Sequence, residues 1–223
     1  MLKRSQLIRN QPTTYSKMSQ TDEKIIEIVS AALETAMELA AEEEGWKVEK
    51  EQGKAVVKSK KNKDGRKMWL CTATVDIAPK ALWDKLLDTD NLTTWNTTLT
   101  ESKTVKKLDD NVKVSYQVTT EGGGGIVSAR DFVYGLKTMT KDNTFVIGGM
   151  SVEVADQPEQ KGHVRAVHGP GCQIVQPVEG EAGKTKFTWL MDCDYKGMIP
   201  NSIIEIAMPT AQLQMVDCIS KLN

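Results

Sequence analysis

Two long helical patterns enclose a long run of strand patterns, and this order constrains the fold more than any other feature of the chain. The first helix is expected to run from an N-cap at Thr21 to a C-terminal glycine at Gly45, and the second follows Pro200. Between them, closely spaced strand candidates are joined by short turns such as Lys63-Asp64-Gly65. An antiparallel sheet covered by the last helix would bury these apolar faces.

A short helix interrupts the strand candidates. Pro79 opens it, and it is expected to cover Lys80 to Leu87. Pro209 lies within the last helical pattern and predicts a kink, because proline removes one backbone hydrogen bond. Strands are expected at roughly 46–50, 54–60, 66–75, 103–108, 112–120, 130–140, 144–154, 161–168, 172–178 and 184–194. This order leaves room for a cavity between the sheet and the last helix.

Length and charge favour an ordinary globular domain over residues 21–223, with residues 1–20 as a flexible tail. A net charge of −1 gives no support for nucleic-acid binding or broad attraction to a membrane surface. The four cysteines are far apart and form no Cys-x-x-Cys pair, so a reducing cytoplasm is expected. Residues 1–20 contain basic and no acidic residues, which leaves mitochondrial targeting as an alternative.

Four consecutive glycines, at residues 122–125, separate two strand patterns. No Gly-Lys-Ser/Thr end and no helix signal follow them, so the run does not match a phosphate-binding loop. Glycine tolerates backbone conformations that other residues avoid. We expect the run to let the chain bend between two central strands of a curved sheet.

The sequence offers little for catalysis. His168 and Cys172 are a conceivable base and nucleophile, but the intervening Gly-Pro-Gly indicates a joint between strands. Asp192 and Asp194 alternate along one strand pattern, which predicts a solvated sheet face rather than an acid and base pair. We expect no metal site and no cofactor.

A set of short motifs, in order along almost the whole chain from about residue 21, resembles the START family of lipid-transfer domains. The likeness is greatest to the subgroup of the steroidogenic acute regulatory protein and its late-endosomal sterol-binding relative. The motifs are Glu44-Gly45-Trp46-Lys47, Trp95-Asn96, Ser128-Ala129-Arg130-Asp131-Phe132-Val133, Gly149-Met150, Pro158-Glu159-Gln160-Lys161-Gly162, His168-Gly169-Pro170, Lys184-Thr185-Lys186-Phe187-Thr188-Trp189-Leu190 and Asp194-Tyr195-Lys196-Gly197-Met198-Ile199-Pro200.

The resemblance implies an α+β helix-grip fold, in which a curved antiparallel sheet wraps a long C-terminal helix around an internal lipid tunnel. It implies a carrier without catalytic residues, metal or cofactor, which holds one sterol-like lipid such as cholesterol and transfers it between membranes. It also implies a gate formed by residues 155–162 and the C-terminal helix. By the same matching, with the helix positions resting on periodicity, the lipid-binding wall comprises Asn96, Leu99, Gln117, Leu136, Ile147, Met150, Gln173, Met208, Gln212 and Met215.

Gln117 and Leu136 stand where the sterol-binding subgroup has an acidic residue facing an arginine. Replacing both charges together can be neutral, whereas losing one would leave a buried charge without a partner. A neutral tunnel leaves a carotenoid as an alternative cargo, and Gln117 retains a donor and an acceptor for a ligand hydroxyl. More remote alternatives are a lipid sensor and a helix-grip enzyme. We expect a monomer that contacts a membrane surface transiently and does not bind nucleic acid.

Overall fold

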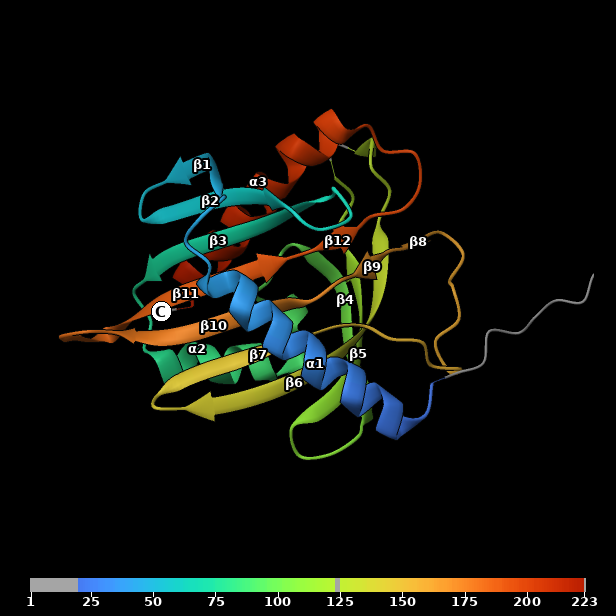
Figure 1. The fold of residues 1–223 in the computed structure, drawn as a ribbon, viewed down its shortest axis with the longest axis horizontal. Coiled ribbons are helices and arrows are strands. Elements are labelled where there is room, and N and C mark those ends of the chain that lie inside the picture. The colour runs from blue at the N-terminus through green and yellow to red at the C-terminus, as the bar shows by residue number, and fades with distance from the viewer. Residues whose placement is uncertain (1–19, 123–124, 223) are drawn as a thin grey trace, which may run out of the picture.

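A computed structural model describes residues 20–122 and 125–222 of this chain. The polypeptide has an α+β architecture with three α-helices, a 3-10 helix and a large antiparallel sheet within that range (Figure 1). The elements are α1 (Asp22–Ala41), β1 (Lys47–Gln52), β2 (Ala55–Lys61), β3 (Lys67–Val75), α2 (Pro79–Leu87), η1 (Thr89–Thr94), β4 (Leu99–Lys107), β5 (Val112–Thr119), β6 (Arg130–Lys141), β7 (Thr144–Ser151), β8 (Val164–Arg165), β9 (Val167–His168), β10 (Gly171–Val178), β11 (Glu181–Met191), β12 (Cys193–Asp194) and α3 (Asn201–Ser220).

The main sheet has the strand order β1-β2-β3-β11-β10-β7-β6-β5-β4, and all neighbours in this path are antiparallel. The short strand β8 joins β6 in parallel, and β12 pairs with β9 in a separate two-stranded sheet. The sequence therefore predicted the antiparallel sheet correctly.

The two faces of the sheet bury different helices. Along β3, Leu70 packs with Leu33 of α1, whereas Trp69 and Cys71 pack in the cluster that contains Leu213 of α3. This alternation follows from the two-residue period of a strand. Figure 1 shows α1 crossing the near side of the sheet over β7 and β6, with α3 behind the sheet. We call these the α1 face and the α3 face.

Local sequence signals set several element boundaries. The Thr21 hydroxyl accepts a hydrogen bond from the backbone N–H of Lys24, as an N-cap should. The helix nevertheless ends at Ala41, four residues before Gly45, which adopts a φ of +78° in the turn that leads into β1. The expected helix end at Gly45 was therefore wrong, because Gly45 lies in the turn before β1 and does not cap the helix. At the other end of the chain, α3 continues through Pro209 without a break.

The glycine run connects β5 and β6, which lie near one edge of the sheet rather than at its centre. Of the four residues, Gly123 and Gly124 lie outside the described residues. Gly122 forms an isolated bridge with Val127, and Gly125 has a φ of +91°, a conformation that favours glycine. The expected tail over residues 1–20 also lies outside the described residues, apart from Gln20.

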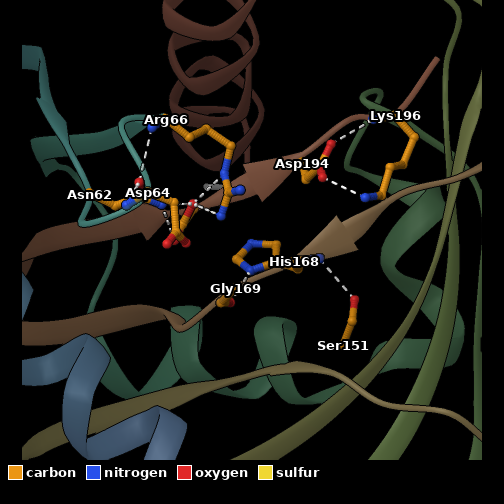
Figure 2. A network of polar contacts seen from close by, with 9 residues as sticks. Asn62, Asp64, Arg66, Ser151, His168, Gly169, Asp194 and Lys196 are labelled. Carbon is orange, nitrogen blue, oxygen red and sulfur yellow. Dashed lines mark hydrogen bonds and ion pairs between the residues drawn. The ribbon is translucent and has the colours of Figure 1, made fainter.

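Asp192 is buried, which corrects the expectation of a solvated carboxylate pair. Its side chain accepts hydrogen bonds from the Asn62 amide and the Arg66 Nε, and an Arg66 Nη2 to Asp192 ion pair measures 2.8 Å. Asp194 is partly exposed and pairs instead with Lys196 (Figure 2). The break between β11 and β12 separates the two aspartates, so they do not share one face of a continuous strand.

Candidate binding cavity

A cavity of about 640 Å³ lies between the sheet and α3. Its volume falls within the range of roughly 300–1,000 Å³ that is typical of small-ligand sites. Residues from α2, η1, the strands β4 to β7, β9 to β11, and α3 line it, together with the β5–β6 connection and the segment before α3. The cavity thus occupies the position where the sequence predicted a tunnel.

The structure brings eight of the ten predicted wall residues to the cavity lining. These are Asn96, Leu99, Gln117, Leu136, Ile147, Gln173, Met208 and Met215. Met150 and Gln212 do not line it.

Backbone geometry explains both departures. Met150 pairs with Gly135 across β6 and β7, and a side chain at Gly135 would collide with Val29 of α1, so this register position belongs to the α1 face. Gln212 is fully buried, and its amide nitrogen donates to the carbonyls of Trp189 (3.2 Å) and Trp69 (3.5 Å). The helical period correctly placed Gln212 on the buried side of α3, but its side-chain amide binds the sheet backbone.

Gln117 and Leu136 both line the cavity but are not directly opposite one another. Gln117 pairs with Phe132, and Leu136 pairs with Lys113, so the two positions lie several residues apart along the strands. Within the described residues, the side-chain amides of Gln117 and Gln173 have no protein hydrogen-bond partner. Each therefore offers a donor and an acceptor to whatever occupies the cavity.

Strand β6 contributes cavity residues that the sequence reasoning missed. Arg130, Phe132, Tyr134 and Leu136 all line the cavity, at the two-residue spacing of one strand face. Only Leu136 was predicted. Extending the same period backwards from Leu136 would have found the other three.

Two polar side chains in the cavity wall are held by backbone carbonyls. The Tyr134 hydroxyl lies 3.0 Å from the Gly149 carbonyl and 3.2 Å from the Gly171 carbonyl. The His168 Nδ1 lies 2.7 Å from the Gly169 carbonyl, and the His168 backbone N–H donates to Ser151 Oγ (Figure 2). Burial lowers the pKa of His168, so the neutral ring with hydrogen on Nδ1 fits this contact.

The possible His168 and Cys172 pair gains no support from its surroundings. Burial raises the pKa of the Cys172 thiol to about 12, whereas an activated cysteine has a lowered pKa. Burial also disfavours the protonated His168 that would stabilise a thiolate. The wall therefore contains a neutral thiol and a neutral imidazole.

Exposed lining residues mark the open side of the cavity, which we call its mouth, and they come from the β5–β6 connection and α3. Ile126 and Ile206 line the cavity and are 77% and 71% exposed, respectively. By contrast, residues 155–162 do not line it. Arg165 donates to the carbonyls of Gln157 and Pro158 and holds that loop to the α1 face of β6. Of the two parts of the implied gate, α3 lines the cavity and residues 155–162 do not, and the gate itself stays a prediction.

An antiparallel sheet packed around a C-terminal helix, with a cavity between them, defines an α+β helix-grip protein. Comparison with known sequences then identifies the family. The START domain model matches residues 27–221, and the chain belongs to this family of lipid-binding and lipid-transfer domains.

Individual relatives agree with this assignment. The mitochondrial steroidogenic acute regulatory protein of Homo sapiens is 32% identical over 192 residues, which are 85% of this chain and 67% of that protein. The Danio rerio protein of the same name is 28% identical over 219 residues, which are 97% of this chain and 76% of that protein. These similarities support the predicted subgroup.

Solved structures share the fold at lower sequence identity. Human StAR-related lipid transfer protein 5 superposes with a TM-score of 0.85 at 18% identity, covering 91% of this chain and 97% of that one. Human STARD10 superposes with a TM-score of 0.73 at 20% identity, covering 85% and 78% respectively.

Among the described helices, none is long and apolar enough to cross a membrane.

Proposed function

We propose that this chain is a non-enzymatic carrier that holds one sterol-like lipid, cholesterol or a related sterol, in the cavity and moves it between membranes. The observation that carries the proposal is the cavity itself, which is walled mainly by apolar side chains and contains neutral amides at Gln117 and Gln173 that have no hydrogen-bond partner among the described residues. Apolar walls with a few polar groups suit a lipid body with a small polar group. Similarity to the steroidogenic acute regulatory protein supports the same cargo class.

The proposed binding site comprises the eight predicted residues that line the cavity. Leu136 and Ile147 pack with Trp83 of α2 in one apolar cluster. Gln117 lies farther along the sheet, opposite Phe132. We therefore assign Leu136 and Ile147 to the apolar body of the lipid and Gln117 to a ligand hydroxyl.

The exposed rim of the cavity suits brief contact with a membrane. Ile126, Met198 and Ile206 come from the β5–β6 connection, the segment before α3 and α3 itself, and all three are exposed. Exposed apolar side chains in the lining, such as Ile126 and Ile206, would lower the cost of opening the cavity against lipid. Replacing Met198, which is exposed and does not line the cavity, with serine should slow transfer between vesicles without weakening binding of a sterol already in solution.

Ligand extraction tests the cargo. Protein purified from a sterol-containing host is extracted with organic solvent, and the extract is analysed by mass spectrometry. A sterol at close to one per protein supports the proposal, whereas recovery of only phospholipid contradicts it. Titration should centre on micromolar concentrations, because about 28 heavy atoms at roughly −0.3 kcal/mol each give about −8 kcal/mol.

A carotenoid is the alternative cargo, because the wall lacks the charged pair expected at Gln117 and Leu136. Mixing the apo-protein with a carotenoid and recording the visible spectrum separates the two cargoes. A saturable, shifted absorption band with no sterol uptake would select the carotenoid.

A further inference from the structure

The cavity face of β6 changes from charged to apolar along its length. Its lining residues run in the order Arg130, Phe132, Tyr134 and Leu136. Six residues of strand span about 20 Å. At the far end, Leu136 packs in the apolar cluster beneath α2. The cavity therefore has a charged end near its mouth and an apolar end beneath α2.

Arg130 is a buried cation with no anionic partner among the described residues. Its residue is 5% exposed, and no described carboxylate forms an ion pair with it. Nε donates to the Tyr195 carbonyl (3.1 Å) and Nη2 to the Lys196 carbonyl (3.2 Å). Nη1 donates to the Ser128 carbonyl and, at 3.2 Å, to the Ser128 hydroxyl. Every one of these acceptors is neutral.

These contacts leave the positive charge of Arg130 uncompensated and one of its N–H donors without an acceptor. A guanidinium has five N–H donors, and the four contacts leave one on Nη2. Arginine remains charged even though burial lowers its pKa. The other charged residue among the described cavity-lining residues, Glu121, is exposed and does not pair with Arg130. The positive charge at this end of the cavity therefore lacks compensation within the described chain.

The same strand pairs its other buried charge. Asp131 faces away from the cavity, is 0% exposed, and accepts two hydrogen bonds from Arg165. A buried charge is costly unless it is paired and hydrogen-bonded. The structure provides an ion pair for Asp131, whose Oδ1 has no hydrogen-bond partner among the described residues, and provides none for Arg130 on the face that lines the cavity.

We propose that Arg130 receives the anionic group of an amphipathic lipid, a sulfate or carboxylate attached to a sterol-sized apolar body. The body would extend along β6 toward Leu136, with its anionic end near the mouth. This inference rests on the proposed sterol-carrier function and refines its ligand class. Oxygen anions match the donor geometry of a guanidinium and form stronger hydrogen bonds than neutral acceptors.

A competing role for Arg130 is purely structural. The side chain joins Ser128 of the β5–β6 connection to Tyr195 and Lys196 ahead of α3. If it acts only as such a clasp, its loss would weaken all ligands alike. A preference between charged and neutral lipids is the property that separates the two roles.

The experiment compares cholesterol, cholesteryl sulfate and cholesteryl hemisuccinate as competitors of a fluorescent sterol. Wild-type protein, Arg130→Gln and Arg130→Lys are tested, with thermal unfolding of each apo-protein recorded in parallel. Lys196→Gln is the matched control, because its Nζ pairs with Asp194 and its side chain does not line the cavity. The sulfate and hemisuccinate arms distinguish the two anion types.

Wild-type protein should bind at least one anionic sterol roughly ten- to a hundredfold more tightly than cholesterol, the range of a hydrogen bond to a charged group. Arg130→Gln should abolish this preference while changing cholesterol affinity by less than about threefold, and Arg130→Lys should retain part of it. Lys196→Gln should keep the preference within about twofold, because its exposed charge is screened.

Equal affinity of the wild type for all three sterols, with cholesterol still bound, would overturn the anion site and leave the sterol-carrier proposal standing. A uniform loss of affinity in Arg130→Gln, with the preference unchanged, would assign the clasp role instead. Failure of the wild type to bind any of the three would overturn both proposals.

Discussion

Arg130 and Asp131 are neighbours on β6 and both are buried, but their side chains have different kinds of partner. Asp131 lies on the α1 face, where Arg165 provides an ion pair at 2.8 Å. Arg130 lies on the cavity face, where its partners among the described residues are carbonyl and hydroxyl oxygens. The alternation of a strand places two adjacent charges in two different environments.

The difference shows that buried polar groups find their partners differently in a closed core and on a cavity face. The α1 face is a closed core, so its charges must be satisfied within the chain. On the cavity face, polar groups rely on backbone carbonyls, as Tyr134 and His168 do, or have no partner among the described residues, as with the Gln117 amide. A ligand can supply the hydrogen-bond partners that the described residues do not provide there.

The largest expected loss of stability comes from breaking the ion pair between Arg165 and Asp131. Arg165→Met should destabilise the fold by about 3–5 kcal/mol, because it leaves the buried Asp131 carboxylate without its cation. Urea denaturation measures the change. Adding Asp131→Asn to Arg165→Met should recover part of the loss, since no buried charge then remains.

An exposed pair supplies the control for that test. Lys24 and Glu27 pair on the surface of α1, and Lys24→Met should produce no measurable change. A cost below about 1 kcal/mol for Arg165→Met would show that water or movement of residues 155–162 already solvates Asp131.

One substitution made on each face sharpens the comparison further. Leu33→Ala removes a side chain from the closed core beneath α1 and should cost about 2–5 kcal/mol. Leu136→Ala enlarges an existing cavity and should cost less in the apo-protein, yet weaken sterol binding by about tenfold or more. Denaturation and sterol titration of both variants check this. Equal stability losses would contradict it.

The pH dependence of folding probes His168 on the cavity face. Burial, as the largest cause, lowers its pKa below 6.5; the Gly169 carbonyl and Asp192 act in the opposite direction, and Arg66 adds to the lowering. A lowered pKa means that the unfolded chain binds the proton more readily. This contribution to stability is therefore complete above pH 6.5 and is lost as pH falls toward the folded pKa.

His168→Asn should remove that part of the pH dependence. The slope due to one group is at most about 1.4 kcal/mol per pH unit, and it should appear in the wild type as the pH falls below about 6.5. Urea denaturation at several pH values gives the difference between the two proteins. Parallel curves would show that His168 stays solvated in the folded state.

The smallest expected effect concerns Gln117. Gln117→Leu should weaken a hydroxylated sterol by about 1 kcal/mol, the value of one neutral hydrogen bond. The same change should leave an apolar analogue without the hydroxyl unaffected or slightly tighter, so the two ligands serve as mutual controls. An unchanged affinity for the hydroxylated sterol would show that Gln117 does not contact it.

Local sequence signals predicted much of the architecture. The hydrophobic periods located α1, α2, α3 and the antiparallel strands, and Lys63-Asp64-Gly65 forms the turn between β2 and β3, where Gly65 has a φ of +80°. Matching of motifs placed Gln117, Leu136 and Ile147 in the cavity lining. Such predictions succeed because each depends on neighbouring residues or on a period that the chain itself carries.

Contacts between distant segments decided the rest. No local pattern could show that Arg66 pairs with Asp192 or that the Gln212 amide donates to the carbonyls of Trp69 and Trp189. Nor could it show that Arg165 binds the carbonyls of Gln157 and Pro158. The sequence by itself determined that Arg130 and Asp131 point to opposite faces of β6. Only the tertiary structure decided which charge received a partner, because burial and pairing depend on strands and loops that are remote in the chain.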